Sequence, residues 1–288
     1  MTLGRRPPKA VLTALREEVH FRCPVPMEDG ICGSPYLSWH HFDPPWRVEN
    51  HHRVEGMIAL CTDHAAKADG GVYTDEQLRR FKQEAAANDA PVEGDLAWRR
   101  QELVLFAGTG LFVNSHVIVA YDGIPHIWFE RNEHGEMLLN YKSLRSNRTI
   151  IENNLWVIPQ DELAEVVCPP RGRKLEIRHL NGDVLKLEFK SYDSADSFLT
   201  EVPGHRHNKT RLEKLAYPLT VLFLTEVTTN GEINIHPDRL DLNGNTFWYP
   251  WFKDAEVAIN LRGPAATERF DAAQQAAIAQ ALYDYNHR

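Results

Sequence analysis

The sequence predicts an α+β protein, in which a small metal-binding module of helices and two short strands precedes a mainly β domain and a C-terminal helix. Cysteines and histidines gather between residues 23 and 64, and strand-like runs recur from about residue 101. A chain of 288 residues that is 43% hydrophobic can bury the cores of two domains. We expect the module over residues 1–90, the β domain over 96–262 and a helical tail over 263–288.

The expected N-terminal elements follow from apolar spacing and from breaker residues. Helical spacing of apolar residues follows Pro7-Pro8, a suitable helix start. Two short apolar runs are separated by Asp43-Pro44-Pro45 and a polar loop, which a strand cannot cross. Asn88–Asp95, with a proline and a glycine, is the best linker candidate. These patterns predict helices over 9–20, from 62 and over 74–87, and strands over 37–41 and 56–61.

The second part of the chain has the residue pattern of a β domain, with apolar and β-branched runs between turn residues. Asn181-Gly182 lies between two alternating runs and is the clearest hairpin signal. The predicted strands are Leu103–Phe106, Val117–Tyr121, His126–Glu130, Met137–Asn140, Leu155–Ile158, Leu175–His179, Val184–Phe189, Leu219–Phe223 and Glu232–Ile235.

The cysteine and histidine cluster suggests two chemical tasks. Three thiols and an imidazole are a donor set suited to a structural zinc ion, and the candidates are Cys23, Cys32, Cys61 and His64. The adjacent pair His40-His41 is not needed for that ion, so these imidazoles are free for chemistry. Cys168 lies outside the cluster and is expected to be a buried thiol.

Two segments of the N-terminal module resemble the HNH endonuclease family, which has a ββα-metal fold. They are Trp39-His40-His41-Phe42-Asp43-Pro44 and Gly56-Met57-Ile58-Ala59-Leu60-Cys61-Thr62-Asp63-His64. The resemblance covers roughly residues 8–87, less than a third of the chain. The order of ligands, paired histidines and apolar strand makes the motif moderately to highly specific.

The resemblance implies hydrolysis of DNA phosphodiester bonds. It makes His41 the general base that activates a water, and His40 a ligand of a catalytic Mg²⁺ or Mn²⁺ ion. Cys23, Cys32, Cys61 and His64 match the positions that hold a structural zinc in some members. The spacing between Cys23 and Cys32 is wider than usual, and Pro24, Pro26 and Gly30 allow that loop to turn back.

Two positions depart from the family pattern. Gly56 stands where members usually carry an asparagine that orients the base, and Asn50 or the His51-His52 pair are alternative orienting groups. Ala65 stands where many members carry a metal-binding histidine or asparagine. The remaining partners for His40 are Asp69, Asp43 and His52, of which Asp69 is the first choice as a ligand and His52 is placed with the catalytic histidines. A competing assignment gives His64 to the catalytic ion and leaves the thiols incomplete.

The net charge of −8 argues against a surface that grips nucleic acid everywhere, so such contacts must be local or shared with a partner. The runs Arg171-Gly172-Arg173-Lys174 and His205–Arg211 could contact phosphates, although a solvated loop explains each equally well. The chain shows no apolar leader and no run of eighteen apolar residues, so we expect no membrane contact. Reduced thiols on a metal favour a cytoplasmic protein.

Two functions of different class stay open. The first is a metal-dependent endonuclease that serves prokaryotic defence against phage or plasmids, whose β domain or a second protein chooses the target. The second is a catalytically silent zinc-binding adaptor, whose β domain binds a protein partner, a second copy of the chain or nucleic acid.

Overall fold

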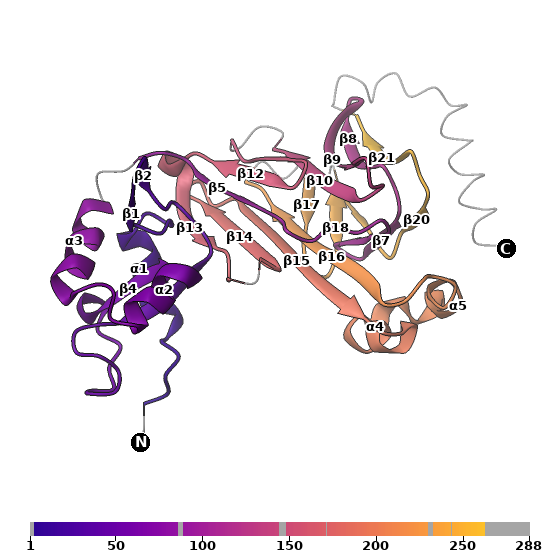
Figure 1. The fold of residues 1–288 in the computed structure, drawn as a ribbon. Helices are drawn as coiled ribbons and strands as arrows, with labels where there is room; N and C mark the ends of the chain where they lie inside the picture. The colour runs from indigo at the N-terminus through magenta and orange to yellow at the C-terminus, as the bar shows by residue number, and fades with distance from the viewer. Residues whose placement is uncertain are drawn as a thin grey trace, which may run out of the picture.

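A computed structural model describes residues 3–85, 89–143, 148–170, 172–229, 233–242 and 244–262. The mixed α and β content that the sequence predicts is confirmed, and most of the structure is β-sheet (Figure 1). The predicted C-terminal helix over 263–288 lies outside the described residues. In the described ranges, the helices lack the combination of length and hydropathy that crossing a bilayer requires.

The N-terminal module surrounds a core of its own. Leu15 of the first helix, Ile58 and Leu60 of the second long strand, and Phe81 of the third helix are buried together. Three of the predicted helices and both predicted strands are present within one or two residues at most ends. The elements are α1 (Lys9–Glu18), β1 (Pro26–Met27), β2 (Gly30–Ile31), β3 (Leu37–His41), the 3₁₀ helix η1 (Val54–Gly56), β4 (Met57–Cys61), α2 (Thr62–Asp69) and α3 (Asp75–Ala85).

The first of two sheets in the second part, here the smaller sheet, comes mostly from one stretch of chain. Its described strands occur in the order β21-β8-β9-β10-β11-β12-β5, and β21 pairs with β8 in parallel. The strands are β5 (Val92–Asp95), β8 (Val117–Tyr121), β9 (Ile124–Arg131), β10 (Met137–Lys142), β11 (Ile150–Glu152), β12 (Leu155–Ile158) and β21 (Val257–Leu261).

The larger sheet holds the described strands in the order β13-β14-β15-β16-β17-β18-β19, and β6 pairs with β16 in parallel to start a branch through β7 and β20. Its strands are β6 (Val104–Ala107), β7 (Gly110–Val113), β13 (Leu163–Val167), β14 (Lys174–His179), β15 (Val184–Tyr192), β16 (Leu219–Val227), β17 (Ile233–Ile235), β18 (Leu240–Leu242), β19 (Asn245–Phe247) and β20 (Trp251–Lys253). Short helices join these strands: η2 (Gln160–Glu162), α4 (Ala195–Glu201), η3 (Pro203–Asn208) and α5 (Lys209–Leu212).

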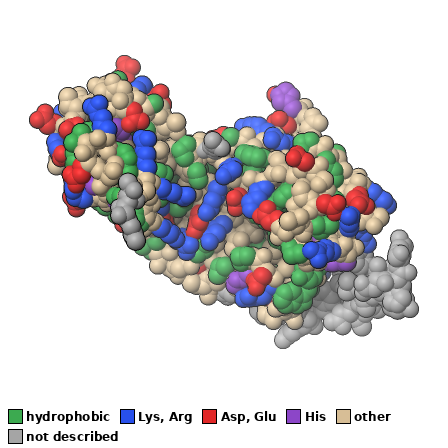
Figure 2. Space-filling view, turned by 90° about the horizontal axis from the view of Figure 1, so that it is seen from below, with side chains coloured by type: hydrophobic (Ala, Val, Ile, Leu, Met, Phe, Trp, Pro, Cys, Tyr) green, Lys and Arg blue, Asp and Glu red, His purple; other side chains and the backbone are tan. Residues whose placement is uncertain are grey.

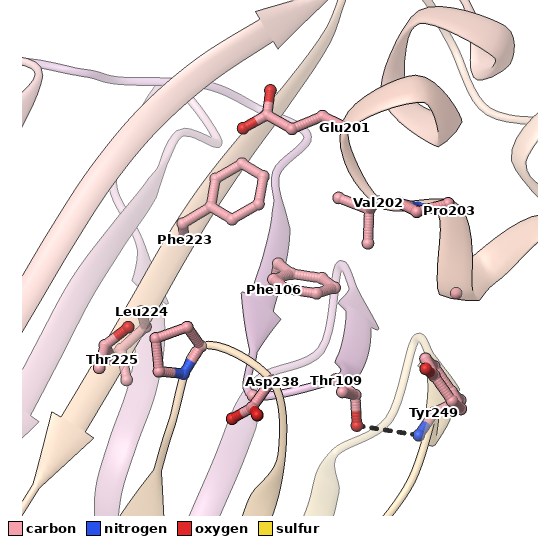
Figure 3. Close-up of a pocket in the computed structure, with 13 residues that line it drawn as sticks. Phe106, Thr109, Glu201, Val202, Pro203, Phe223, Leu224, Thr225, Asp238 and Tyr249 are labelled. Carbon is pink, nitrogen blue, oxygen red and sulfur yellow. Dashed lines mark hydrogen bonds between the residues drawn. The ribbon is translucent and has the colours of Figure 1, made fainter.

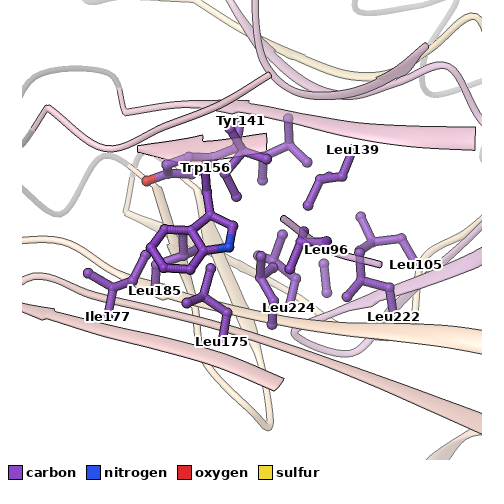
Figure 4. Close-up of a cluster of buried hydrophobic side chains, with 14 of the residues drawn as sticks. Leu96, Leu105, Leu139, Tyr141, Trp156, Leu175, Ile177, Leu185, Leu222 and Leu224 are labelled. Atoms are coloured by element: carbon purple, nitrogen blue, oxygen red, sulfur yellow. The ribbon is translucent and has the colours of Figure 1, made fainter. Parts of the chain in front are cut away.

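The two sheets face each other across one hydrophobic core. Figure 4 shows Trp156 and Tyr141 from the smaller sheet above Leu175, Leu185 and Leu224 from the larger sheet. All five side chains are buried, so each sheet is covered on its inner face by the other. On the outer face of the larger sheet, α4 and α5 cover Tyr192 and Val221 in a separate hydrophobic cluster, and the part formed by β14 and β15 carries polar residues.

Strand alternation decides what that outer face carries. In β15, Leu185, Leu187 and Phe189 are buried, whereas Lys186, Glu188 and Lys190, which alternate with them, are only half-buried. This period of two puts every second side chain into the core and the rest into solvent. The predicted hairpin at residues 181–182 is confirmed as the turn between β14 and β15, with Gly182 at a φ of 93°.

The N-terminal module docks against the edge of the sandwich. Arg16 of α1 forms an ion pair with Glu165 of β13 at 2.5 Å, and the Tyr36 hydroxyl lies 2.8 Å from an Asp95 carboxylate oxygen of β5. Val92–Asp95, which the sequence places in a linker, is therefore part of the smaller sheet and pairs with β12. The β5 pairing keeps the junction short and fixes the module beside β13 and β14 (Figure 1).

Candidate functional site

The four predicted zinc ligands come together in the module. Their donor atoms all lie within 4.8 Å of one another, and the set is Cys23, Cys32, Cys61 and His64. His64 Nδ1 lies 3.3 Å from Sγ of Cys23 and 3.3 Å from Sγ of Cys61, and the Sγ atoms of Cys32 and Cys61 are 3.8 Å apart. The loop between Cys23 and Cys32 turns back through the short β1-β2 hairpin.

These distances fit a tetrahedral metal ion. Sulfurs bound to zinc at about 2.3 Å in a tetrahedral site are about 3.8 Å apart. Burial raises the pKa of the Cys23 thiol and of the Cys32 thiol, so thiolates at these positions need a nearby cation. The donor set, three sulfurs and one imidazole nitrogen, suits zinc. Because His64 lies among the thiols, the geometry favours His64 as the fourth ligand of this ion. It does not favour the competing assignment, in which His64 binds a second, catalytic ion.

The β3-β4 hairpin positions the histidine pair. In its antiparallel register His40 lies opposite Ile58 and His41 opposite Met57. Successive residues of a strand point to opposite faces, so the two rings leave the strand in different directions. His41 is buried, with 7% of its surface exposed, and its ring centroid lies 4.8 Å from that of Trp46.

A backbone carbonyl fixes the orientation of His41. Its Nε2 donates to the carbonyl oxygen of His51 at 3.0 Å, which leaves Nδ1 as the ring atom that can accept a proton. The His51 ring holds this loop in turn: Nε2 donates to the Pro44 carbonyl at 2.8 Å, and Nδ1 accepts from the Arg53 N–H at 3.1 Å. Burial lowers the pKa of His41 to about 4, so the imidazole is neutral near pH 7.

Gly56 is required by the packing of this same corner. A Cβ at Gly56 would lie 1.9 Å from the Asp43 carbonyl oxygen and 2.9 Å from the His51 ring. An asparagine side chain therefore cannot occupy this position. The orienting partner comes from the His51 backbone, and the Asn50 side chain donates to the Trp46 carbonyl at 3.0 Å.

His40 meets the first-choice acidic partner on α2. Its Nδ1 lies 2.8 Å from Oδ1 of Asp69, across 29 residues of sequence. The two residues line a cavity of about 680 Å³ together with His41, and Arg5, Arg47 and Asp75 add charged groups to its wall. An imidazole and a carboxylate with water-accessible space are suitable ligands for a divalent cation.

No family model, no curated protein and no solved structure matches the chain.

The other predicted members of the site take different positions. His52 lies near His41, with ring centroids 5.9 Å apart, but it stacks on Trp46 and its Nε2 donates to the Gly4 carbonyl. Asp43 forms an ion pair with Arg79 of α3. Ala65 lines the cavity and contributes no ligand atom. Asp69 is thus the acidic candidate that the fold brings to His40.

Sequence patterns pointed to the histidines but missed three charged residues of the cavity. Arg5 lies in the basic start of the chain, Arg47 in the loop after the prolines, and Asp75 at the first position of α3. A basic start and a helix-initiating aspartate are common on solvated surfaces, so neither carries a local signal for a cavity. Cys168 is confirmed as a buried thiol outside the cluster, and burial raises its pKa to about 12.

A second cavity, of about 320 Å³, lies between α4 and the larger sheet (Figure 3). Phe106, Phe223 and Tyr249 face it, and the Tyr249 backbone N–H donates to Thr109 Oγ1 at 3.0 Å. Its described lining holds neither a cysteine nor a histidine. Of these two cavities, the first therefore holds the groups suited to metal binding and proton transfer.

Proposed function

We propose that the chain is a metal-dependent endonuclease that hydrolyses DNA phosphodiester bonds in the cavity at His40 and His41. The observation that carries the proposal is the orientation of His41 by the His51 carbonyl, next to a His40–Asp69 pair. The His41 imidazole can take a proton, and the His40–Asp69 pair is suited to bind a cation.

The chain's residues would act on water and phosphate as follows. His41 Nδ1 takes a proton from a water molecule as the water oxygen bonds to phosphorus. The P–O3′ bond breaks with its electron pair on O3′, which takes a proton from solvent water. Arg5 and Arg47 on the cavity wall attract the charged backbone on either side of the scissile phosphate. His40 and Asp69 would hold a Mg²⁺ or Mn²⁺ ion. Such an ion, when bound, offsets the negative charge that develops on the phosphate and the leaving oxygen.

The Cys23, Cys32, Cys61 and His64 cluster supports this site without taking part in the reaction. Cys61 ends β4 and His64 lies in the first turn of α2, so a metal there ties the hairpin that carries His41 to the helix that carries Asp69. A rigid connection of this kind preserves the short distance between His40 and Asp69.

The test is cleavage of supercoiled plasmid DNA by the zinc-loaded full chain with added Mg²⁺ or Mn²⁺. His41→Ala should lower the rate by about 10²–10⁴-fold, because the general base is lost. His134→Ala is the matched control, since that histidine is exposed on a distant turn. Equal cleavage by wild type and His41→Ala would exclude His41 as the base.

The adaptor alternative has one observation in its favour. Ala65 lines the cavity at the position where a third protein ligand for the divalent ion is expected. His40 and Asp69 are therefore the two ligand candidates that the described residues place together there. An adaptor predicts no cleavage by wild type under any divalent ion, with the zinc cluster fully loaded. Metal analysis of the same sample separates this result from a failure to load the protein.

A further inference from the structure

The outer face of the larger sheet carries a set of cations that the proposed chemistry does not use. Lys174 and Arg178 lie on β14, and Lys186 and Lys190 lie on β15; these four residues are the basic face. Their side chains are 32–39% exposed. Figure 2, which views this side, shows blue side chains spread over the surface between the two ends of the molecule.

A carboxylate lies among the cations of the basic face. Glu176 is buried, and it pairs with Arg178 at 2.6 Å, Lys174 at 3.0 Å and Lys186 at 3.5 Å. Burial favours the protonated form of this carboxyl, but the three cations outweigh that effect and lower its pKa to about 2. Lys190 pairs with Glu201 and lies 3.8 Å from Glu188. The four cations of the face therefore exceed the carboxylates Glu176, Glu188 and Glu201 by one charge.

The basic face continues toward the candidate active site along α1. Arg178 lies 3.7 Å from Glu165, which also pairs with Arg16 of α1. Lys9, the first residue of α1, stabilises the same Glu165 carboxylate electrostatically. Four residues earlier, Arg5 lines the cavity of His40 and His41. Cations therefore follow one another from the middle of the sheet to the cavity wall.

We propose that the basic face binds the phosphate backbone of duplex DNA and leads it to the cavity of His40 and His41. This inference rests on the proposed nuclease function for its substrate. Residues two apart on a strand are about 6.7 Å apart, so Lys186 and Lys190 span about 13 Å, roughly four phosphate spacings of one strand measured along the duplex axis. The face explains how a chain of net charge −8 can bind a polyanion locally.

The side chains of the face favour duplex over single-stranded nucleic acid. The outward positions of β14 and β15 are 174, 176, 178, 184, 186, 188, 190 and 192, and the aromatic residue among them, Tyr192, is buried against α4. Phe223 of β16 is covered by Lys190, whose Nζ lies 4.9 Å from the ring centroid. Recognition of single strands relies on stacking of bases on exposed aromatic rings. Phosphate contacts alone suit a rigid double helix.

The experiment measures binding of a labelled 20-base-pair duplex to the full, zinc-loaded chain without added Mg²⁺ or Mn²⁺, so that binding is separated from cleavage. Lys174→Gln with Lys186→Gln should weaken binding by about eightfold per lysine at 0.1 M salt, and lower the slope of log K against log salt by about 0.9 per lost contact. Arg178 still pairs with Glu176 in this double variant, so the buried Glu176 carboxylate keeps a cationic partner.

Two further variants make the assignment sharper. Glu188→Gln removes an exposed negative charge opposite Lys174 in the sheet and should tighten binding, an effect that a purely structural ion-pair network does not predict. Lys142→Gln is the matched control, because this lysine is exposed on the smaller sheet, and its binding should equal that of wild type.

The possible results separate this inference from the proposed function. Unchanged binding by the double lysine variant and by Glu188→Gln, with plasmid cleavage intact, overturns the basic face and leaves the nuclease standing. Charge-dependent duplex binding without cleavage under any divalent ion supports the face and removes the nuclease. Tighter binding of a single strand of equal length overturns the assignment to duplex DNA.

Discussion

Gly56 shows how one residue fixes the geometry of the histidine site. Its hydrogen atom occupies a place where a methyl group would overlap the Asp43 carbonyl and crowd the His51 ring. The His51 carbonyl orients His41, so a shift of this loop changes the direction of the base. Glycine at this position is a packing requirement of the chain.

We expect Gly56→Ala to destabilise the protein by about 3 kcal/mol, since the added methyl group overpacks a rigid backbone contact. Urea unfolding checks the free energy, and plasmid cleavage by the residual folded protein checks the base. Gly71→Ala is the control that separates backbone strain from a steric clash. Gly71 has a φ of 75° but open space at its Cβ, so this substitution should lower the free energy of unfolding by less than Gly56→Ala does. Equal stability of wild type and Gly56→Ala would contradict the packing argument.

His205 is a second residue whose environment has a measurable consequence. It is fully buried, its Nε2 donates to the Thr109 carbonyl at 2.7 Å, and its Nδ1 faces the Asn208 amide at 3.1 Å. Burial, with a smaller contribution from the nearby His207, lowers its pKa from 6.5 to about 4. The folded protein therefore keeps the neutral ring at pH values where the unfolded chain binds a proton.

This difference predicts a loss of stability in acid. Above pH 6.5 the ring is neutral in both states and contributes no pH dependence; between about pH 6.5 and 4 the unfolded state gains a proton first, so the free energy of unfolding falls by up to about 3 kcal/mol. His205→Gln, which retains a donor for Thr109, should show a flatter profile. Denaturant unfolding at pH 7.5, 5.5 and 4.5 compares the two, and parallel profiles would rule out His205 as the source.

At the scale of elements, β15 separates the core of the sandwich from the basic face. Its buried positions interlock with the smaller sheet, and its outer positions carry lysine and glutamate. One strand therefore supports both stability and the proposed DNA contact, through residues that alternate along it.

The alternation predicts opposite effects for neighbouring substitutions. Leu187→Ala should cost about 2–5 kcal/mol, because it leaves a cavity in the core, whereas Lys186→Ala should change stability by less than about 0.5 kcal/mol. Thermal or urea unfolding measures the first effect, and DNA binding measures the second residue's role. A large stability loss for Lys186→Ala would mean that its pair with Glu176 holds the sheet together.

At the scale of the whole molecule, the N-terminal module has a hydrophobic core separate from those of the β domain, so the metal cluster stabilises the module locally. Cys23 and Cys61 belong to the N-terminal core, which shares no residue with the core between the sheets. Module and sandwich meet mainly through contacts of α1, Tyr36 and β5. Loss of metal should therefore affect one part of the molecule first.

Removal of the metal with a strong chelator should expose β3, β4 and α2 to hydrogen exchange, while β15 and β16 keep their protection. Cys32→Ser should reduce the bound zinc, and Cys168→Ser should not, because that buried thiol lies outside the cluster. Exchange mass spectrometry and metal analysis provide both readouts. Simultaneous loss of protection in both parts would show that they unfold as one unit.

Local sequence determined the composition of the site and many of its elements. The order of Cys23, Cys32, Cys61 and His64 predicted the cluster, because metal ligands need only the right donors within reach. Alternating apolar residues and Asn181-Gly182 predicted β14, β15 and their turn, because these signals act over neighbouring residues. The helices α4 and α5 were missed, since a strand-rich pattern surrounds them.

Tertiary structure alone decided which distant groups meet. The sequence left Asp69, Asp43 and His52 as alternatives, and the packing of α2 against β3 brought Asp69 to His40 while α3 supplied Arg79 to Asp43. A backbone carbonyl orients His41, and backbone groups have no residue-specific signature in a sequence. The parallel pairing of β6 with β16 and the gathering of cations from β14, β15 and α1 also join segments far apart in the chain, and local patterns carry no information about such contacts.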